Sequence, residues 1–264
     1  MMLGMGSRQA RWPFPPGVGA DEHLAETFRI LRIKWGEVPG GEQRRVRSDD
    51  LLKLPDQELL RLWSEALADS STGDAYSVRG WYHTLYGDVF RGKKVLEVGS
   101  GLGFDGITFA ANGAEWTFVD IVKPNLEVVQ RLCKLKGLTN VRFCYMEDLR
   151  SLAALPPDYA AIYGQGSLIN LPLQATRVEA QALLEHLPVG GRWIELGYPK
   201  RRWIHDGRMP ADKWGKKTDG GAPWVEWHDL KKIRDFLAPA QFDVVFTLDF
   251  HKYDFNWFDL VRRR

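Results

Sequence analysis

The sequence predicts an α/β protein: a doubly wound, mostly parallel sheet of seven strands, closed by a C-terminal antiparallel hairpin and preceded by a helical extension. Three patterns lead to this prediction. An apolar run at residues 95–98 ends in glycines at every second position and is followed by a helical segment, 104–111. Two β-rich runs near the C-terminus are too close together for a helical crossover, so they should be antiparallel. Other β-rich runs recur between the helical segment 104–111 and the C-terminal runs: 116–120, 141–145, 159–163 and 192–196.

The remaining segments predict the helices and the division of the chain. Apolar residues recur at helical spacing in 124–136, 174–187 and 231–237, between or after these runs. We expect the C-terminal hairpin to pair residues 242–250 with 256–261. Residues 90–264 should therefore form the ligand-binding sheet domain, and residues 1–89 a helical extension.

Within the extension, helical spacing predicts helices at 21–35 and 51–68, the second broken by Pro55. The first 20 residues are rich in glycine, proline and arginine and should be irregular, and 36–48 should be a polar link.

The glycine turn indicates a ligand site. With no side chains at Gly99, Gly101 and Gly103, a ligand can lie directly on the backbone. Glu97 sits inside the strand just before this turn, and Asp120 ends the next strand. An acid at that strand end is placed to accept hydrogen bonds from both hydroxyls of a ribose.

The Glu-x-Gly-x-Gly-x-Gly pattern of residues 97–103 resembles motif I of the class I S-adenosylmethionine-dependent methyltransferases. The C-terminal hairpin is similar to the topology of that family, whereas a dinucleotide fold would repeat a second parallel half. The resemblance covers roughly residues 90–264 and implies S-adenosylmethionine as the cofactor. A loose Gly-x-Gly-x-x-Gly at residues 101–106 keeps a nicotinamide-dependent reductase open as an alternative.

The resemblance also implies roles for later residues. In the family, an acid after the third strand binds the adenine amino group, a position that Glu147 and Asp148 match. Residues 164–172 are similar to motif IV, between methyl donor and acceptor, so Asn170 is expected at the acceptor. The complete predicted cofactor set is Tyr76, Arg79, Trp81, Tyr82, Glu97, Gly99, Gly101, Gly103, Asp120, Ile121, Glu147, Asp148, Gly164 and Gln165.

Four of these residues belong to an aromatic segment at 74–86, immediately before the first strand of the sheet. Aromatic faces attract a sulfonium as they do other cations, and Arg79 is suited to pair with the cofactor carboxylate. We expect His83 to be the catalytic general base if the acceptor is a hydroxyl, and Tyr86 to contact the acceptor. The alternative is that these aromatics are ordinary core and rim residues.

A second aromatic group follows the fifth strand, and in it Tyr198 and Trp203 are predicted to bind the acceptor. Aromatics beside lysines and arginines suit a small aromatic, sugar-like or anionic molecule. They also stack nucleobases, but basic residues are not concentrated enough to favour RNA.

Composition limits the remaining choices. The chain has 264 residues, 44% hydrophobic, 27% charged, and a net charge of +2, so nothing demands nucleic acid or a membrane. No apolar run approaches the roughly 20 residues that span a bilayer, and we expect a cytoplasmic enzyme. The two cysteines should be reduced, and no metal-ligand spacing is present. The extension is either a lid over the acceptor site or an element that forms a homodimer.

The sequence therefore predicts a methyltransferase that acts on a nitrogen or oxygen of a small-molecule acceptor. Three alternatives stay open: a protein or RNA methyltransferase, an NAD(P)-dependent reductase, and a non-catalytic scaffold that binds the cofactor.

Overall fold

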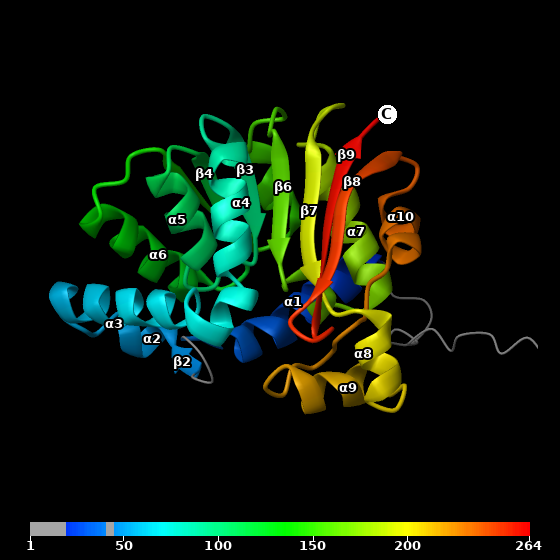
Figure 1. The fold of residues 1–264 in the computed structure, drawn as a ribbon, viewed down its shortest axis with the longest axis horizontal. Helices are drawn as coiled ribbons and strands as arrows, with labels where there is room; N and C mark the ends of the chain where they lie inside the picture. Colours follow the sequence, from blue (N-terminus) through cyan, green and yellow to red (C-terminus); the bar gives the residue numbers. More distant parts are fainter. Residues whose placement is uncertain (1–19, 41–44) are drawn as a thin grey trace, which may run out of the picture.

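A computed structural model describes residues 20–40 and 45–264, except for the side chains of residues 20–22 and of Tyr76. At its centre lies one sheet with the strand order β5-β4-β3-β6-β7-β9-β8 (Figure 1). The first five strands in this order are parallel, and β9 is antiparallel to both β7 and β8. The strands are β3 (Lys94–Val98), β4 (Glu115–Asp120), β5 (Val141–Tyr145), β6 (Ala161–Gln165), β7 (Arg192–Gly197), β8 (Phe242–Phe250) and β9 (Phe255–Arg262). The predicted seven-stranded fold with its closing hairpin is confirmed.

Helices cover both faces of this sheet, and each face has its own apolar core. On β3 the pleat sends Val95 into one core and Leu96 and Val98 into the other. The first core includes α4 (Gly80–Phe90), α5 (Phe104–Ala111) and α6 (Lys123–Leu135). The second includes α1 (Ala20–Trp35), α7 (Leu173–Leu184) and α10 (Leu230–Leu237). The other helices are α2 (Ser48–Leu51), α3 (Asp56–Asp69), α8 (Lys200–His205) and α9 (Ala211–Thr218), with 3₁₀ turns at Gly73–Ser77, Leu149–Ala154 and Leu168–Asn170.

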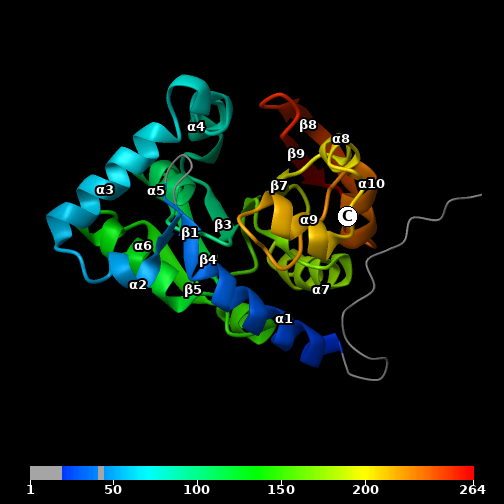
Figure 2. The same cartoon turned by 90° about the horizontal axis from the view of Figure 1, so that it is seen from below.

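The extension packs against the carboxyl ends of the strands rather than standing apart from them. Figures 1 and 2 show α1 running beneath the sheet at this edge. The Arg32 guanidinium donates hydrogen bonds to the carbonyl oxygens of Ile121, at 2.9 Å, and Met146, at 3.3 Å. On α3, the Trp63 indole donates to the carbonyl of Leu102 in the glycine loop, at 2.8 Å. The extension is therefore attached directly to the loops that follow β3, β4 and β5.

Two of the differences from the predicted segments concern strands, while the helix predicted at 174–187 ends earlier, at Leu184. The expected polar link contains a small antiparallel hairpin of β1 (Glu37–Pro39) and β2 (Arg45–Arg47), in which buried Val38 pairs with Val46. The fourth predicted strand begins two residues later than expected, at Ala161. The reason is local: the Tyr159 amide bonds to the carbonyl of His186, outside the ladder. Of the expected irregular start, residues 1–20, all but the last lie outside the described residues, and α1 begins at Ala20.

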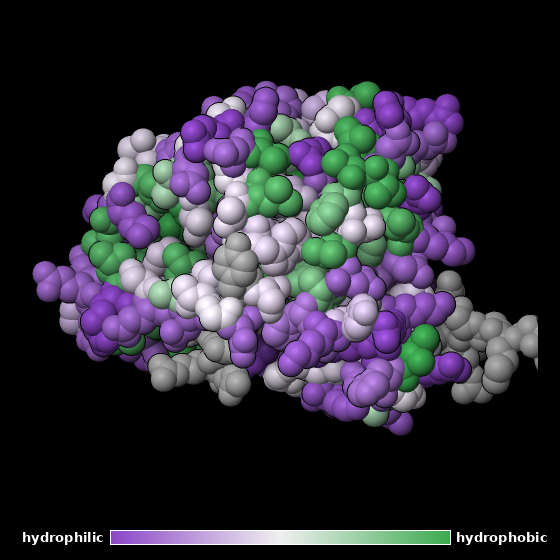
Figure 3. Space-filling view, in the orientation of Figure 1, coloured by the Kyte–Doolittle hydropathy of each residue, from purple (hydrophilic) through white to green (hydrophobic). Residues whose placement is uncertain are grey.

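β8 is one of the two edge strands of the sheet, and its surface is partly apolar. Figure 3 shows apolar side chains gathered over this part of the molecule. Val244, Val245 and Leu248 on β8 are exposed, as is Leu85 on α4. Among the helices of residues 20–40 and 45–264, none combines the length and apolarity needed to cross a membrane.

Candidate functional site

A cavity of about 470 Å³ lies at the carboxyl edge of the sheet, where α1 passes beneath the strands. Ligands of open α/β sheets bind at this edge. The glycine loop between β3 and α5, the end of β4 and the segment after β6 all contribute to its wall. From the extension come Phe28, Leu31 and Trp35 of α1, together with Val38 and Arg79.

The three glycines of the loop have left-handed φ angles but different surroundings. A Cβ on Gly101 would meet no atom within 4 Å, because this position faces open space. By contrast, a Cβ on Gly99 would lie 2.4 Å from Cβ of Ser167, and one on Gly103 2.9 Å from Cγ1 of Val129. Gly101 therefore leaves room for a ligand, whereas Gly99 and Gly103 allow close packing within the protein.

Asp120 joins this loop to the end of β4. Its Oδ2 accepts a hydrogen bond of 3.0 Å from the Gly101 amide, and its Oδ1 accepts one of 2.8 Å from the Val122 amide. Burial raises the pKa of this carboxyl to about 6, against the effect of these donors. Since Asp120 also lines the cavity, it can both shape the loop and accept hydrogen bonds from a ligand.

Glu97 is a buried carboxyl on β3 at the same wall. Its Oε2 accepts a hydrogen bond of 2.8 Å from the Trp116 indole. Burial, together with the negative charge of Asp105, raises its pKa well above the usual range. Gly106 lets α5 approach this strand, because a Cβ there would lie 2.6 Å from Oε2 of Glu97.

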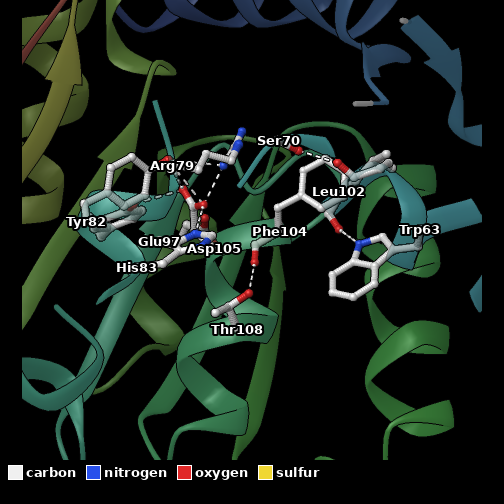
Figure 4. Close-up of polar contacts among 12 residues, drawn as sticks. Trp63, Ser70, Arg79, Tyr82, His83, Glu97, Leu102, Phe104, Asp105 and Thr108 are labelled. Atoms are coloured by element: carbon white, nitrogen blue, oxygen red, sulfur yellow. Dashed lines mark hydrogen bonds and ion pairs between the residues drawn. The ribbon is translucent and has the colours of Figure 1, made fainter. Parts of the chain in front are cut away.

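Asp105, in the first turn of α5, is the centre of a buried hydrogen-bonded cluster (Figure 4). Its Oδ1 lies 2.5 Å from Nη1 of Arg79 and 2.7 Å from Nε2 of His83. Its Oδ2 accepts a hydrogen bond of 2.9 Å from the hydroxyl of Tyr163. Although burial alone would raise it, the Arg79 guanidinium and His83 hold the pKa of Asp105 below its usual range. The cluster fixes Arg79 at the cavity wall.

The structure brings about half of the predicted site residues to the cavity. Those that line it are Arg79, Glu97, Gly99, Gly101, Asp120, Ile121, Gln165, Asn170 and Tyr198. Two buried side-chain oxygens of lining residues have no hydrogen-bond partner among the described residues: Oγ of Ser167 and Oδ1 of Asn170. The side chain of Tyr76 lies outside the described part of the chain.

The other predicted residues are not among those that line the cavity: Trp81, Tyr82, His83, Tyr86, Gly103, Glu147, Asp148, Gly164 and Trp203. The aromatics of α4 pack instead against the C-terminal hairpin. Tyr82 stacks on Trp257 with ring centroids 4.8 Å apart, Trp81 packs on the same ring, and the Tyr86 hydroxyl donates to Asp259 at 2.7 Å.

The two acidic residues after β5 likewise lie outside the cavity lining. Glu147 is exposed, while Asp148 caps the following 3₁₀ turn and pairs with Arg150. Trp203 packs on Trp227 and donates to the carbonyl of Met209 at 2.7 Å.

Several lining residues were not predicted from the sequence, among them Phe28, Leu31, Leu171, Glu179 and Asp219. The sequence shows Phe28 and Leu31 on one apolar stripe of a helix, but such a stripe does not indicate which part of the protein the helix packs against. Glu179 carried a usable signal, because it is a charged residue within the buried stripe of a predicted helix.

In sequence, the chain is similar to curated proteins of two different activities. No model of a known protein family matches the chain. The ubiquinone biosynthesis O-methyltransferase of Bordetella parapertussis is 26% identical over 179 residues, 68% of this chain. The chain spans about three fifths of that relative, since the match covers 61% of it. An endoglucanase of Paenibacillus polymyxa is 26% identical over 158 residues, which are 54% of this chain and 38% of that protein.

Among solved structures, magnesium protoporphyrin IX methyltransferase of Synechocystis PCC 6803, with S-adenosylmethionine bound, aligns with 94% of this chain and 100% of its own. The TM-score is 0.52 and the identity 17%. Together with the strand order and the antiparallel hairpin, this likeness shows that the chain has the fold of the class I S-adenosylmethionine-dependent methyltransferases.

Proposed function

We propose that this chain is an S-adenosylmethionine-dependent methyltransferase that acts on a small-molecule acceptor. The observation that carries the proposal is the open position at Gly101, next to the buried carboxyl that holds its amide. A ligand can lie on the backbone there while Asp120 accepts hydrogen bonds from its ribose hydroxyls. When bound, the cofactor supplies a methyl group carried by a sulfonium.

The residues at the cavity fit such a ligand. Ile121 and Met146 offer apolar surface at the ends of β4 and β5, where the adenine would lie. At the other end, Arg79 can pair with the carboxylate of the cofactor, and Glu97 places a carboxyl group near its ammonium. Because Glu147 and Asp148 do not line the cavity, we assign neither of them to the adenine.

We place the acceptor against the segments that follow β6 and β7, at Gln165, Asn170, Leu171 and Tyr198, and against the apolar lining residues of α1. Methyl transfer is an in-line displacement, so the chain's main tasks are to align the acceptor and to exclude water. We propose a positioning role for His83, because its Nε2 bonds to Asp105 and its ring does not line the cavity. The methyl group goes to an oxygen or a nitrogen of this acceptor.

A small acceptor is favoured by the size and cover of the cavity. Its volume of about 470 Å³ is in the range of small-molecule sites. The contacts of Arg32 and Trp63 with the sheet domain support a role of the extension as a lid over this cavity rather than as a dimer contact. A protein or RNA substrate would need a more open groove.

Calorimetry with S-adenosylhomocysteine and with NADH tests the proposal directly. We expect binding of S-adenosylhomocysteine only, and mass spectrometry should detect its formation from S-adenosylmethionine with an accepted substrate. Tight binding of NADH alone would instead identify a reductase. Binding of S-adenosylhomocysteine without turnover of any acceptor would favour a non-catalytic scaffold.

A further inference from the structure

Glu179, on α7, is a buried carboxyl without a partner in the described part of the chain. Its side chain is 3% exposed, and it lines the cavity. Among the residues that the structure describes, none donates a hydrogen bond to it and none forms an ion pair with it. Buried carboxyl groups are normally paired, because removing one from water without a partner costs free energy. A group like this at a cavity wall suggests a partner that arrives with the ligand.

The face of α7 that carries Glu179 packs into an apolar core. Ala175 and Ala180, on the same side of α7, belong to the apolar core that also contains Phe28 and Leu31 of α1 and Leu171. The last three line the same cavity as Glu179. Burial raises the pKa of Glu179 to about 8, and no charged group contributes to this shift. The carboxyl is therefore mostly protonated in the free protein at neutral pH.

The other charges at the cavity wall limit what the acceptor can be. Four further carboxyl groups line the cavity: Glu97, Asp105, Asp120 and Asp219. The guanidinium of Arg79 is held by Asp105. Asp105 and Asp219 are paired with Arg79 and Arg45, so they offer no free charge to a ligand. Arg79 is the one Lys or Arg among the described lining residues, so an anionic acceptor finds no unpaired cation there, whereas a basic nitrogen finds the unpaired carboxyl of Glu179. The apolar residues around Glu179 suit a hydrocarbon or aromatic body that carries the charge.

We infer that Glu179 determines acceptor specificity by binding a basic nitrogen of the acceptor, whose apolar body packs against Phe28, Leu31 and Leu171. This inference rests on the proposed methyltransferase function and adds to it the chemical class of the acceptor: an amine with an apolar or aromatic body. Glu179 recognises the acceptor, and no covalent step is assigned to it.

The pairing has a consequence for protons. The free protein holds a proton on Glu179, and an amine arrives as an ammonium ion. Formation of the ammonium–carboxylate pair requires Glu179 to lose its proton, which leaves to solvent. Binding of an amine at pH 7 should therefore release about one proton, since a group of pKa about 8 is roughly nine-tenths protonated there.

The experiment compares three probes that share one ring system: naphthylmethylamine, naphthylmethanol and naphthoate. Their binding to the full chain saturated with S-adenosylhomocysteine is measured by calorimetry at pH 7, in two buffers of different ionisation enthalpy. The proteins are the wild type, Glu179→Gln, and Glu185→Gln as a control. Glu185 lies just beyond the same helix and is exposed.

We expect the wild type to bind the amine at least about tenfold more tightly than the alcohol, and to release about one proton on binding it. Glu179→Gln should lose at least about tenfold in affinity for the amine, a change of about 1.4 kcal/mol. It should release no proton and should bind the alcohol as before. Glu185→Gln should behave as the wild type.

The possible failures are distinguishable. If the wild type does not bind S-adenosylhomocysteine, the proposed function itself is wrong. If it does bind, but prefers the alcohol or naphthoate or releases no proton with the amine, only the role of Glu179 is refuted; this comparison needs no variant to fold. Weaker binding of S-adenosylhomocysteine by Glu179→Gln would place Glu179 in the nucleotide site and overturn the inference.

Discussion

The backbone amide of Gly101 donates a hydrogen bond of 3.0 Å to Oδ2 of Asp120. This contact joins the loop after β3 to the end of the neighbouring strand β4. It holds Gly101 in the left-handed region, at a φ angle of 53°, with open space where a side chain would be. The chain's own groups thus fix the shape of the loop, and such preorganisation lowers the cost of binding a ligand.

Gly101→Val should abolish binding of S-adenosylhomocysteine while the protein stays folded. The branched side chain would occupy the open space, and the left-handed φ angle would cost about 1–2 kcal/mol of stability. Gly137→Val is the matched control, because Gly137 also has a left-handed φ angle and open surroundings but lies at the end of α6, away from the cavity. Calorimetry and thermal unfolding of both variants separate lost binding from backbone strain. Normal binding by Gly101→Val would mean that the ligand lies elsewhere.

Asp120→Ala should weaken binding of S-adenosylhomocysteine by about 1–3 kcal/mol, because it removes a charged acceptor of hydrogen bonds from the ribose and the anchor of the loop. Asp158→Ala provides the control: Asp158 forms an exposed ion pair with Lys94 and does not line the cavity. Equal affinities of the two variants, measured by calorimetry, would contradict the assignment of Asp120 to the ribose.

The pH dependence of stability should reveal Glu179. Its folded pKa of about 8 exceeds the unfolded value of about 4.3, so the folded state binds its proton more tightly. Its contribution to stability is fully present below about pH 4 and is lost as the pH rises towards 8. The total loss is on the order of 5 kcal/mol.

Glu179→Gln has no such group, so it does not lose this stability as the pH rises. The free energy of unfolding of Glu179→Gln minus that of the wild type should therefore be several kcal/mol larger at pH 8 than at pH 5. Urea denaturation at the two pH values measures this difference. In the exposed control Glu185→Gln the difference from the wild type should not change with pH. If the difference between Glu179→Gln and the wild type is also the same at both pH values, the carboxyl of Glu179 in the wild type is not buried as described.

His83→Gln should reduce turnover less than about tenfold. The amide of glutamine can still donate a hydrogen bond to Asp105, which is the contact that His83 makes. Loss of a general base would instead cost about 10²- to 10⁴-fold. Single-turnover rates and their pH profile, measured with any acceptor found by screening, decide between these roles; a loss of 10²-fold with unchanged cofactor affinity would restore His83 as the base.

The parts of this molecule that could be predicted from sequence are those set by local patterns. Residues 141–145 and 242–250 are strands with the predicted bounds, and 104–111 is the predicted helix, because periodicity and the positions of glycine determine such elements. The glycine loop and Asp120 could be predicted for the same reason, because each follows or ends a strand that the sequence pattern identifies.

The aromatic segment before β3 could not be interpreted in this way. Tyr82 and Tyr86 have the composition of a ligand site, but both rings pack on Trp257 of β9 and the Tyr86 hydroxyl bonds to Asp259, more than a hundred residues away in the sequence. Aromatic side chains suit a core and a binding site equally well. Only the packing of α4 against the C-terminal hairpin decides between them, and no local pattern specifies that contact.

The position of α1 has a kinetic consequence. Phe28, Leu31 and Trp35 form part of the cavity wall, while Arg32, between them, holds the carbonyl oxygens of Ile121 and Met146. If α1 acts as the proposed lid, a molecule bound there leaves only when these hydrogen bonds break and the helix moves aside. We therefore expect dissociation of the product, rather than transfer of the methyl group, to set the slowest rate of the cycle. Arg32→Ala would then bind ligands more weakly and turn over faster.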